Sequence, residues 1–198
     1  GFLGARYDLG NGHLTQMIQR AFGLRPSDRP GGHLDCVAQP TSGKVALHFE
    51  AGTHSLWQRN HIHPRARQLY PESRAILQEF IRQHPNWSFL QLGSKATPFD
   101  GVADATGLPL DQTIAILAQC EYFVGIVSGP MHLATALGLK CIVLLNFPEA
   151  HEVMLPTLKF TGVVESEWLY PQNVHLHQED DAPLVRRLTL ANLNRAFQ

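Results

Sequence analysis

The chain has 198 residues, of which 44% are hydrophobic, and its 16 basic and 17 acidic side chains give a formal net charge of -1. This length and apolar content are typical of one folded domain and exclude a disordered or low-complexity protein. The near-neutral charge, without a run of Lys or Arg, argues against nucleic acid as a partner. No apolar stretch approaches the roughly 20 residues that a membrane span requires.

Residues 1–40 differ in pattern from the rest of the chain. Apolar side chains between Leu14 and Phe22 recur at helical spacing, and Gly23 ends the pattern. Residues 25–32 then combine two prolines and two glycines with mixed charge, which is the composition of a linker. We therefore expect an N-terminal helix and linker over residues 1–40, followed by the main domain over residues 41–198.

In the main domain, short apolar runs alternate with amphipathic stretches. The runs predict strands over residues 45–49, 87–92, 122–127 and 141–145, with two further short strands over 161–164 and 173–177. The stretches predict helices over residues 71–84, 112–119 with Asp111 as N-cap, 129–137, and 183–197 with Leu184, Val185, Leu188 and Leu193 available for burial. Apolar strands that alternate with helices indicate a parallel sheet covered on both faces. We predict an α/β fold with a Rossmann-like, doubly wound parallel sheet.

The turn after residue 127 carries the strongest functional signal. Ser128 stands where its hydroxyl can cap a helix, and Pro130 lies near the first helical position, where no N–H is needed. The free N–H groups and the positive dipole end of such a helix attract an anion such as phosphate. Gly129 leaves room for the anion, and His132 in the first turn can donate a hydrogen bond to it. A purely structural strand-to-helix turn is the alternative interpretation.

Residues 125–134 (GIVSGPMHLA) resemble the signature of family 9 glycosyltransferases, in which asparagine, aspartate, serine, glycine, proline, methionine, histidine, leucine and alanine follow a glycine. This family includes the heptosyltransferases of lipopolysaccharide assembly. Residues 43–53, 90–93 and 110–121 are similar to the family's preceding segments, in the same order. The resemblance implies the C-terminal, nucleotide-sugar-binding half of a GT-B fold.

The resemblance also implies a donor site. Its residues would be Ser128, Gly129, Pro130 and His132 at the diphosphate, Gly52, Thr53 and His54 opposite them, Lys95 at the ribose and Leu108 at the nucleobase. The implied reaction transfers a sugar to a glycan or lipopolysaccharide-type glycolipid acceptor and needs no metal or other cofactor. The three cysteines show no CxxC spacing and favour a reducing, cytoplasmic setting, to which the family adds peripheral contact with the inner membrane.

Two departures from the family pattern leave other functions open. Val127 stands where the family has aspartate, and Ile126 where it often has asparagine, so a polar contact of the donor site is missing. The family's acceptor surface and proposed catalytic base belong to an N-terminal domain, which 40 residues cannot form. We assign no catalytic residue and expect transfer only where an N-terminal domain or a second copy completes the site. The alternative is a non-catalytic or degenerate Rossmann module for binding or assembly.

Two His-x-His pairs, at residues 61–63 and 175–177, raise the possibility of a metal-dependent enzyme. Alternate residues of a strand point to one side, so each pair can offer two imidazoles to a metal. Neither pair has a third ligand at motif spacing, so we expect solvated histidines and no metal site. The sequence also lacks the Gly-x-Ser-x-Gly elbow of hydrolases and the Gly-x-Gly-x-x-Gly loop of dinucleotide oxidoreductases.

Overall fold

The computed structural model describes residues 25, 34, 36–50, 68–95, 99–146, 169–180 and 182–198. The expected helix before residue 23, the strand at residues 161–164 and the first histidine pair lie outside these ranges. The expected domain boundary at residue 40 stays a prediction. No helix in the described ranges is both long enough and apolar enough to cross a membrane.

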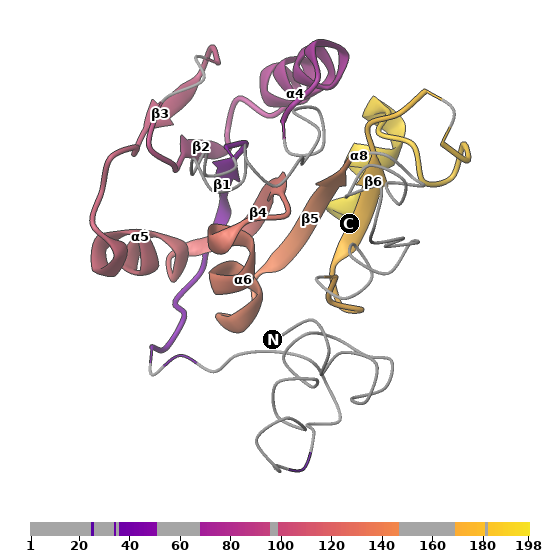
Figure 1. Cartoon of the computed structure of the whole chain (residues 1–198). Coiled ribbons are helices and arrows are strands. Elements are labelled where there is room, and N and C mark those ends of the chain that lie inside the picture. Colours follow the sequence, from indigo (N-terminus) through magenta and orange to yellow (C-terminus); the bar gives the residue numbers. More distant parts are fainter. Residues whose placement is uncertain are drawn as a thin grey trace, which may run out of the picture.

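The described residues form one six-stranded sheet with helices between its strands (Figure 1). The strands are β1 (Thr41–His48), β2 (Ser88–Gln91), β3 (Val102–Asp104), β4 (Cys120–Ile126), β5 (Lys140–Leu145) and β6 (Val174–His177). The helices are α4 (Pro71–Gln83), α5 (Leu110–Leu117), α6 (Gly129–Ala136) and α8 (Leu190–Ala196). Every neighbouring pair of strands is parallel. The predicted α/β fold with a Rossmann-like parallel sheet is confirmed.

The strand order, β3-β2-β1-β4-β5-β6, places a topological switch point between β1 and β4. From β1 the chain builds outward through β2 to β3, and it then returns to the other side of β1 and builds outward again. In open sheets of this kind, ligands bind beyond the carboxyl ends of the strands at the switch point. The two central strands approach closely there at Gly125 of β4. A Cβ added to this glycine would lie only 2.4 Å from the carbonyl oxygen of His48 in β1.

Each face of the sheet has its own apolar core. On one face, α4 and α8 pack together through the stacked rings of Phe80 and Phe197, whose centroids lie 4.6 Å apart. On the other face, the strands pack against Leu117 from α5 and Met131 from α6, both fully buried. Successive residues of the central strands alternate between these two cores, which explains why the strands are almost wholly apolar.

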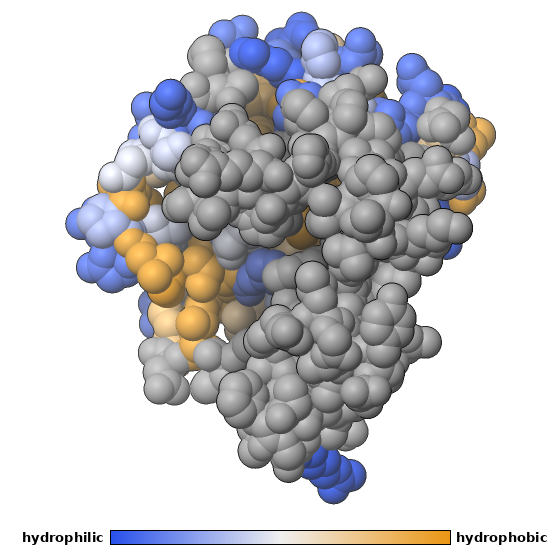
Figure 2. Space-filling view, viewed as in Figure 1, coloured by the Kyte–Doolittle hydropathy of each residue, from blue (hydrophilic) through white to orange (hydrophobic). Residues whose placement is uncertain are grey.

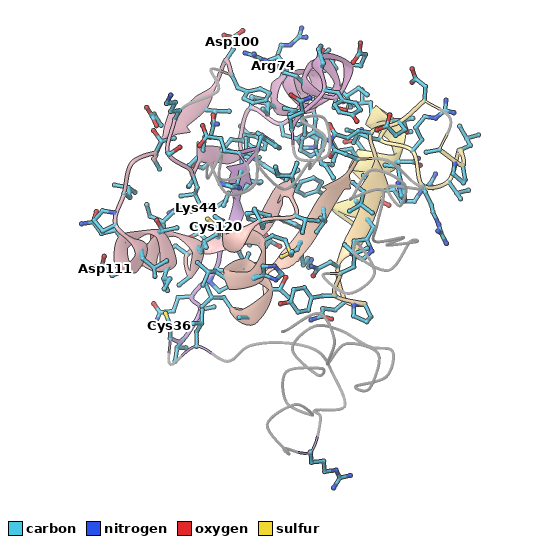
Figure 3. All side chains as sticks on the ribbon, viewed as in Figure 1. Cys36, Lys44, Arg74, Asp100, Asp111 and Cys120 are labelled. Carbon is cyan, nitrogen blue, oxygen red and sulfur yellow. The ribbon has the colours of Figure 1, made fainter. Side chains whose placement is uncertain are left out.

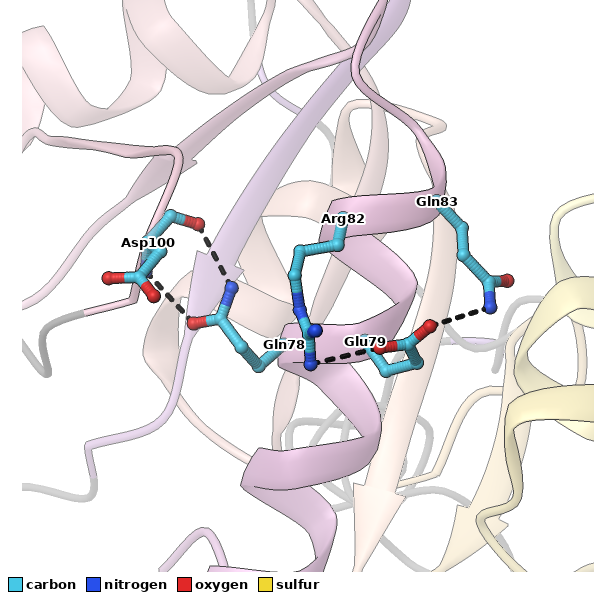
Figure 4. A network of polar contacts seen from close by, with 5 residues as sticks. All are labelled: Gln78, Glu79, Arg82, Gln83 and Asp100. Carbon is cyan, nitrogen blue, oxygen red and sulfur yellow. Dashed lines mark hydrogen bonds and ion pairs between the residues drawn. The ribbon is translucent and has the colours of Figure 1, made fainter.

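The segment that enters β3 is fixed to α4 by paired hydrogen bonds (Figure 4). The side-chain amide of Gln78 accepts from the backbone N–H of Asp100 at 2.9 Å and donates to its carbonyl oxygen at 3.1 Å. Sequence patterning missed β3 because this strand has only three residues, of which Ala103 and Asp104 are exposed. A short edge strand of this kind has no apolar run to reveal it.

Two helix boundaries differ from the predictions. Helix α5 begins at Leu110 with Pro109 as its N-cap, so Asp111 lies in the first turn instead of at the cap, where its carboxylate still faces the positive end of the helix dipole. Helix α8 begins only after Thr189, whose hydroxyl accepts a hydrogen bond from the Asn192 N–H at 3.1 Å.

The late start of α8 leaves part of the expected apolar face outside the core. Residues 183–187 form a turn instead of helix, because Arg187 pairs with His177 at the edge of the sheet. Leu184 and Val185, expected to be available for burial, are 72% and 75% exposed. Leu188 and Leu193 are buried, as predicted.

Apolar side chains also gather on the surface beside α5, as Figure 2 shows. Leu110 at the start of this helix is 65% exposed, and Val37 is 83% exposed.

The cysteines divide between surface and interior: Figure 3 shows Cys36 on the extended segment before β1 and Cys120 at the start of β4. Cys120 and Cys141 are buried, as the sequence predicts, and burial raises the pKa of their thiols to about 11 and about 12.

Candidate functional site

The start of α6 lies at the carboxyl end of β4, directly at the switch point. Ser128 is the N-cap, with the extended backbone conformation of that position, and Gly129 opens the helix. The first helical hydrogen bond runs from the His132 N–H to the Ser128 carbonyl oxygen at 3.2 Å. The predicted strand, turn and helix are therefore confirmed.

The hydroxyl of Ser128 does not cap the helix, contrary to the sequence prediction. A capping hydroxyl accepts from the N–H of the second or third helical residue. The second residue here is Pro130, which has no N–H, so one of the two usual donors is missing. The Ser128 Oγ is buried and has no hydrogen-bond partner.

The start of α6 is exposed at Gly129. Gly129 is exposed, and a Cβ built on it would meet no atom within 4 Å. The N–H groups of Gly129 and Met131 lie in the first turn, where helix geometry provides no intrahelical acceptor. The positive end of the helix dipole adds to their attraction for negative charge.

His132 contacts a residue that the sequence did not single out. Its Nδ1 lies 2.8 Å from the hydroxyl oxygen of Tyr170, and the two rings meet edge to face with centroids 5.4 Å apart. Tyr170 precedes β6 and lies 38 positions further along the chain. Sequence spacing gives no signal for such a pair, because only the packing of the chain brings the two residues together.

The loops after β1 and β2 meet through Glu50. Its Oε2 accepts from the N–H and the hydroxyl of Ser94, both at 2.8 Å, and from the N–H of Lys95 at 3.1 Å. Partial burial raises the pKa of Glu50, but these hydrogen bonds and nearby His48 outweigh that effect and lower the pKa overall. Glu50 lies within residues 43–53, which are similar to the family, but no sequence pattern pairs it with Ser94.

His48 ends β1 next to this junction. Its side chain is buried, and its Nδ1 has no hydrogen-bond partner. Burial lowers the pKa of the imidazole to about 4, although the charge of Glu50 acts in the opposite direction. His48 is therefore neutral near pH 7, and a buried polar atom without a partner is unusual enough to mark this edge of the sheet.

The remaining expected donor residues divide between described and undescribed parts of the chain. Lys95 is exposed just after β2, and its N–H is tied to Glu50. Leu108 is half-buried and follows Gly107, whose N–H donates to the carbonyl oxygen of Gly93 at 2.8 Å. Both residues thus lie near the end of β2, whereas Gly52, Thr53 and His54 lie outside the described ranges. The roles of all five residues stay predictions.

A buried amide network supports the other half of this edge. Asn146 after β5 and Gln178 after β6 both donate to the carbonyl oxygen of Gln68, at 2.7 and 3.1 Å. Gln178 also donates to the Asn146 side chain at 2.7 Å and accepts from the Tyr70 N–H at 3.0 Å. Since Gln68 forms a β-bridge with Glu50, the network joins the ends of β1, β5 and β6.

The second histidine pair is less accessible than expected. His177 is buried and His175 is half-buried, which corrects the expectation of solvated side chains. Both lie on the same side of β6, because they alternate with Leu176 along the strand. Burial lowers the pKa of His175 to about 4, with further lowering from His177 and Arg186. No group of three His, Cys, Asp or Glu side chains within the described ranges could hold a metal ion.

Comparisons with known proteins agree with the fold. The sequence model of Glycosyltransferase family 9 (heptosyltransferase) matches residues 95–159, which include β4 and the start of α6. A search of curated proteins found no match.

Solved structures with a similar fold include two of the protein TibC and one of the protein WaaC. One is the dodecameric, iron-containing heptosyltransferase TibC in complex with ADP-D-β-D-heptose, which is 16% identical in sequence and has a TM-score of 0.58. The match covers 91% of the present chain and 51% of the TibC chain. TibC from enterotoxigenic E. coli H10407, described as an iron-containing dodecameric glycosyltransferase, is 14% identical with a TM-score of 0.53 and the same coverage. E. coli heptosyltransferase WaaC with ADP is 12% identical with a TM-score of 0.51, covering 90% and 51% of the two chains.

These structural similarities establish the fold of the domain. The chain spans about half the length of the solved structures that it matches. The described residues of this chain do not supply the donor cluster that an iron ion would need. The family match includes the complete turn from Ser128 to His132, on which the sequence resemblance depended. The resemblance of this chain to the family 9 glycosyltransferases is therefore confirmed.

Proposed function

We propose that this domain binds a nucleoside-diphosphate sugar at the carboxyl edge of its sheet, with the diphosphate at the start of α6. One observation carries the proposal: the turn that matches the family also begins a helix at the topological switch point of the sheet. Sheet topology and family resemblance are independent arguments, and both select the same turn.

The geometry of that turn suits a diphosphate. The open space at Gly129 allows a phosphate oxygen to approach the backbone, and the first-turn N–H groups supply donors. Ser128 offers a buried hydroxyl without a partner, which a phosphate oxygen would satisfy. His132 would add a hydrogen bond from the same turn, and Lys95 would bind at the ribose from the neighbouring loop.

The reaction that we propose for the complete system is transfer of the donor sugar to a glycan or a lipopolysaccharide-type glycolipid. Because the chain spans about half of its structural relatives, we propose that an N-terminal domain or a second copy contributes the acceptor surface and the catalytic base. The setting would be cytoplasmic, with peripheral contact at the inner membrane. Val127, at the position of the family's aspartate, packs against the core beneath α6, so its contribution here is apolar.

Calorimetric titration of the 198-residue chain with ADP, GDP, UDP and their sugar conjugates tests the proposal. We expect at least one of them to bind, and we expect His132→Ala to weaken that binding by about 1–3 kcal/mol, the range for a hydrogen bond to a charged group. Lys95→Ala should also weaken binding. Lys140→Ala is the matched control, because Lys140 begins β5 at the opposite edge of the sheet. Failure of every nucleotide to bind would contradict the proposal.

A further inference from the structure

His132 is held by a buried tyrosine. The Tyr170 side chain is 3% exposed, and its hydroxyl oxygen lies 2.8 Å from the Nδ1 of His132. Burial, with a smaller contribution from Cys141, raises the pKa of the Tyr170 hydroxyl. The phenol therefore keeps its proton at neutral pH and has one hydrogen to donate.

The segment that carries Tyr170 is itself fixed against α6. The Asn173 N–H donates to the Tyr170 carbonyl oxygen at 3.0 Å, which closes a turn. The Asn173 side chain then donates to the Thr135 hydroxyl at 3.0 Å, and Thr135 lies one helical turn after His132. Two contacts on successive turns of α6 thus hold the Tyr170 hydroxyl at the imidazole.

We propose that Tyr170 is a positioning residue that fixes the tautomer of His132. A phenol is a better hydrogen-bond donor than acceptor, because its oxygen lone pair is delocalised into the ring. When the Tyr170 hydroxyl donates to Nδ1, the ring proton of neutral His132 must lie on Nε2. Imidazole in this form presents an N–H donor, which is what a phosphate oxygen at the start of α6 requires. The expected effect on ligand binding rests on the proposed function, whereas the assignment of the His132 tautomer is independent of that function.

Nitrogen-15 NMR of the histidine rings tests the tautomer in the 198-residue chain without any nucleotide. The spectrum is recorded at about pH 8, above the ordinary histidine pKa of about 6.5, and His132→Gln identifies the resonances of His132. We expect the Nε2–H tautomer to dominate in the wild type and Tyr170→Phe to produce a mixture. A dominant Nδ1–H tautomer in the wild type, or an unchanged tautomer in Tyr170→Phe, would overturn the proposal.

Thr135→Val is the matched control for Tyr170→Phe. It removes the hydrogen bond between Thr135 of α6 and Asn173 of the Tyr170 turn but leaves the partner of His132 in place. We expect it to leave the tautomer unchanged, and an equal shift in this variant would show that general loosening, not the phenol, is responsible.

Titration with ADP then measures the benefit for ligand binding. Tyr170→Phe should weaken ADP binding about two- to tenfold, the effect of one ordinary hydrogen bond, and Thr135→Val should not. An unchanged affinity in Tyr170→Phe would overturn the positioning role. If the wild type binds no nucleotide at all, the proposed function fails, while the tautomer measurement still decides the role of Tyr170.

Discussion

Glu50 accepts two hydrogen bonds from Ser94, one from its N–H and one from its hydroxyl, each at 2.8 Å. This pair joins the loop after β1 to the loop after β2 at the edge where we place the donor. The close approach depends on Gly93, because a Cβ there would lie 2.9 Å from the Glu50 Oε2, and its φ of +131° is a conformation that favours glycine. Glu50 therefore stabilises the conformation of the loop after β2 at this edge of the sheet.

Glu50→Gln should lower the stability of the fold at neutral pH by about 0.5–1.5 kcal/mol, the net contribution of a hydrogen bond. The partial exposure of Glu50 favours the lower end of that range. Because folding lowers the pKa of Glu50, its contribution is present above the unfolded-state pKa of about 4.3 and disappears as the pH falls through the folded-state value. Urea unfolding at pH 7 and pH 3.5 checks this: the difference between wild type and variant should shrink at the lower pH, and a constant difference would contradict it.

Two glycines near the switch point, one in β4 and one at the start of α6, should respond differently to substitution. Gly125→Ala should cost about 1–3 kcal/mol or more, because its Cβ would lie 2.4 Å from the backbone of β1 and would force the central strands apart. Gly129→Ala should change stability by less than about 0.5 kcal/mol, since a Cβ there meets no atom within 4 Å. Thermal unfolding of both variants measures the contrast.

The same two variants separate stability from ligand binding. Although Gly129→Ala leaves the fold intact, its methyl group would occupy space in front of the helix start and should weaken ADP binding. Unchanged affinity in this variant would place the phosphate elsewhere. An equal loss of stability in the two variants would contradict the close β1–β4 contact.

His48 should make the fold sensitive to acid. Its pKa is lowered to about 4 in the folded chain, so the unfolded chain binds a proton that the folded chain does not bind between about pH 6.5 and pH 4. Stability should fall across this range as the pH decreases. His48→Asn should reduce the fall, and His175, whose pKa is also lowered to about 4, should account for part of what remains. Equal pH dependence in wild type and His48→Asn would show that His48 is not buried as a neutral ring.

Nucleotide binding should be independent of metal. The described residues contain no cluster of metal-binding side chains, although TibC, whose fold is similar, is described as iron-containing. We expect elemental analysis of the purified chain to find far less than one iron atom per chain and expect ADP affinity to be the same with and without EDTA. Stoichiometric iron, or loss of affinity in EDTA, would contradict this expectation.

The sequence allowed prediction of those parts of the fold that depend on local pattern. Apolar strands and amphipathic helices were predicted correctly near both central strands, and the start of α6 was found from Ser128, Gly129 and Pro130. The sequence failed where tertiary pairing overrides local preference. Residues 183–187 have a helical pattern but form a turn, since the edge of the sheet provides a pairing partner for Arg187.

The candidate site shows the same division. Its helix start has a local sequence signal, whereas its supporting contacts join residues far apart in the chain, such as Glu50 with Ser94 and His132 with Tyr170. Such pairs have no characteristic spacing, because the strand order alone determines which loops meet. The helix start was predicted correctly at Gly129, but the Ser128 hydroxyl does not cap α6, and Pro130 in the second helical position removes one of its two usual donors.

Amide NMR of the 198-residue chain during titration with ADP shows directly whether a nucleoside diphosphate binds at the start of α6. We expect the largest shifts at Gly129, Met131 and His132, with smaller shifts at Ser94 and Lys95, while Gly43 at the opposite edge stays unchanged. Saturable shifts concentrated at the opposite edge, or no saturable shifts at residues 128–132 with ADP, GDP or UDP, would contradict it.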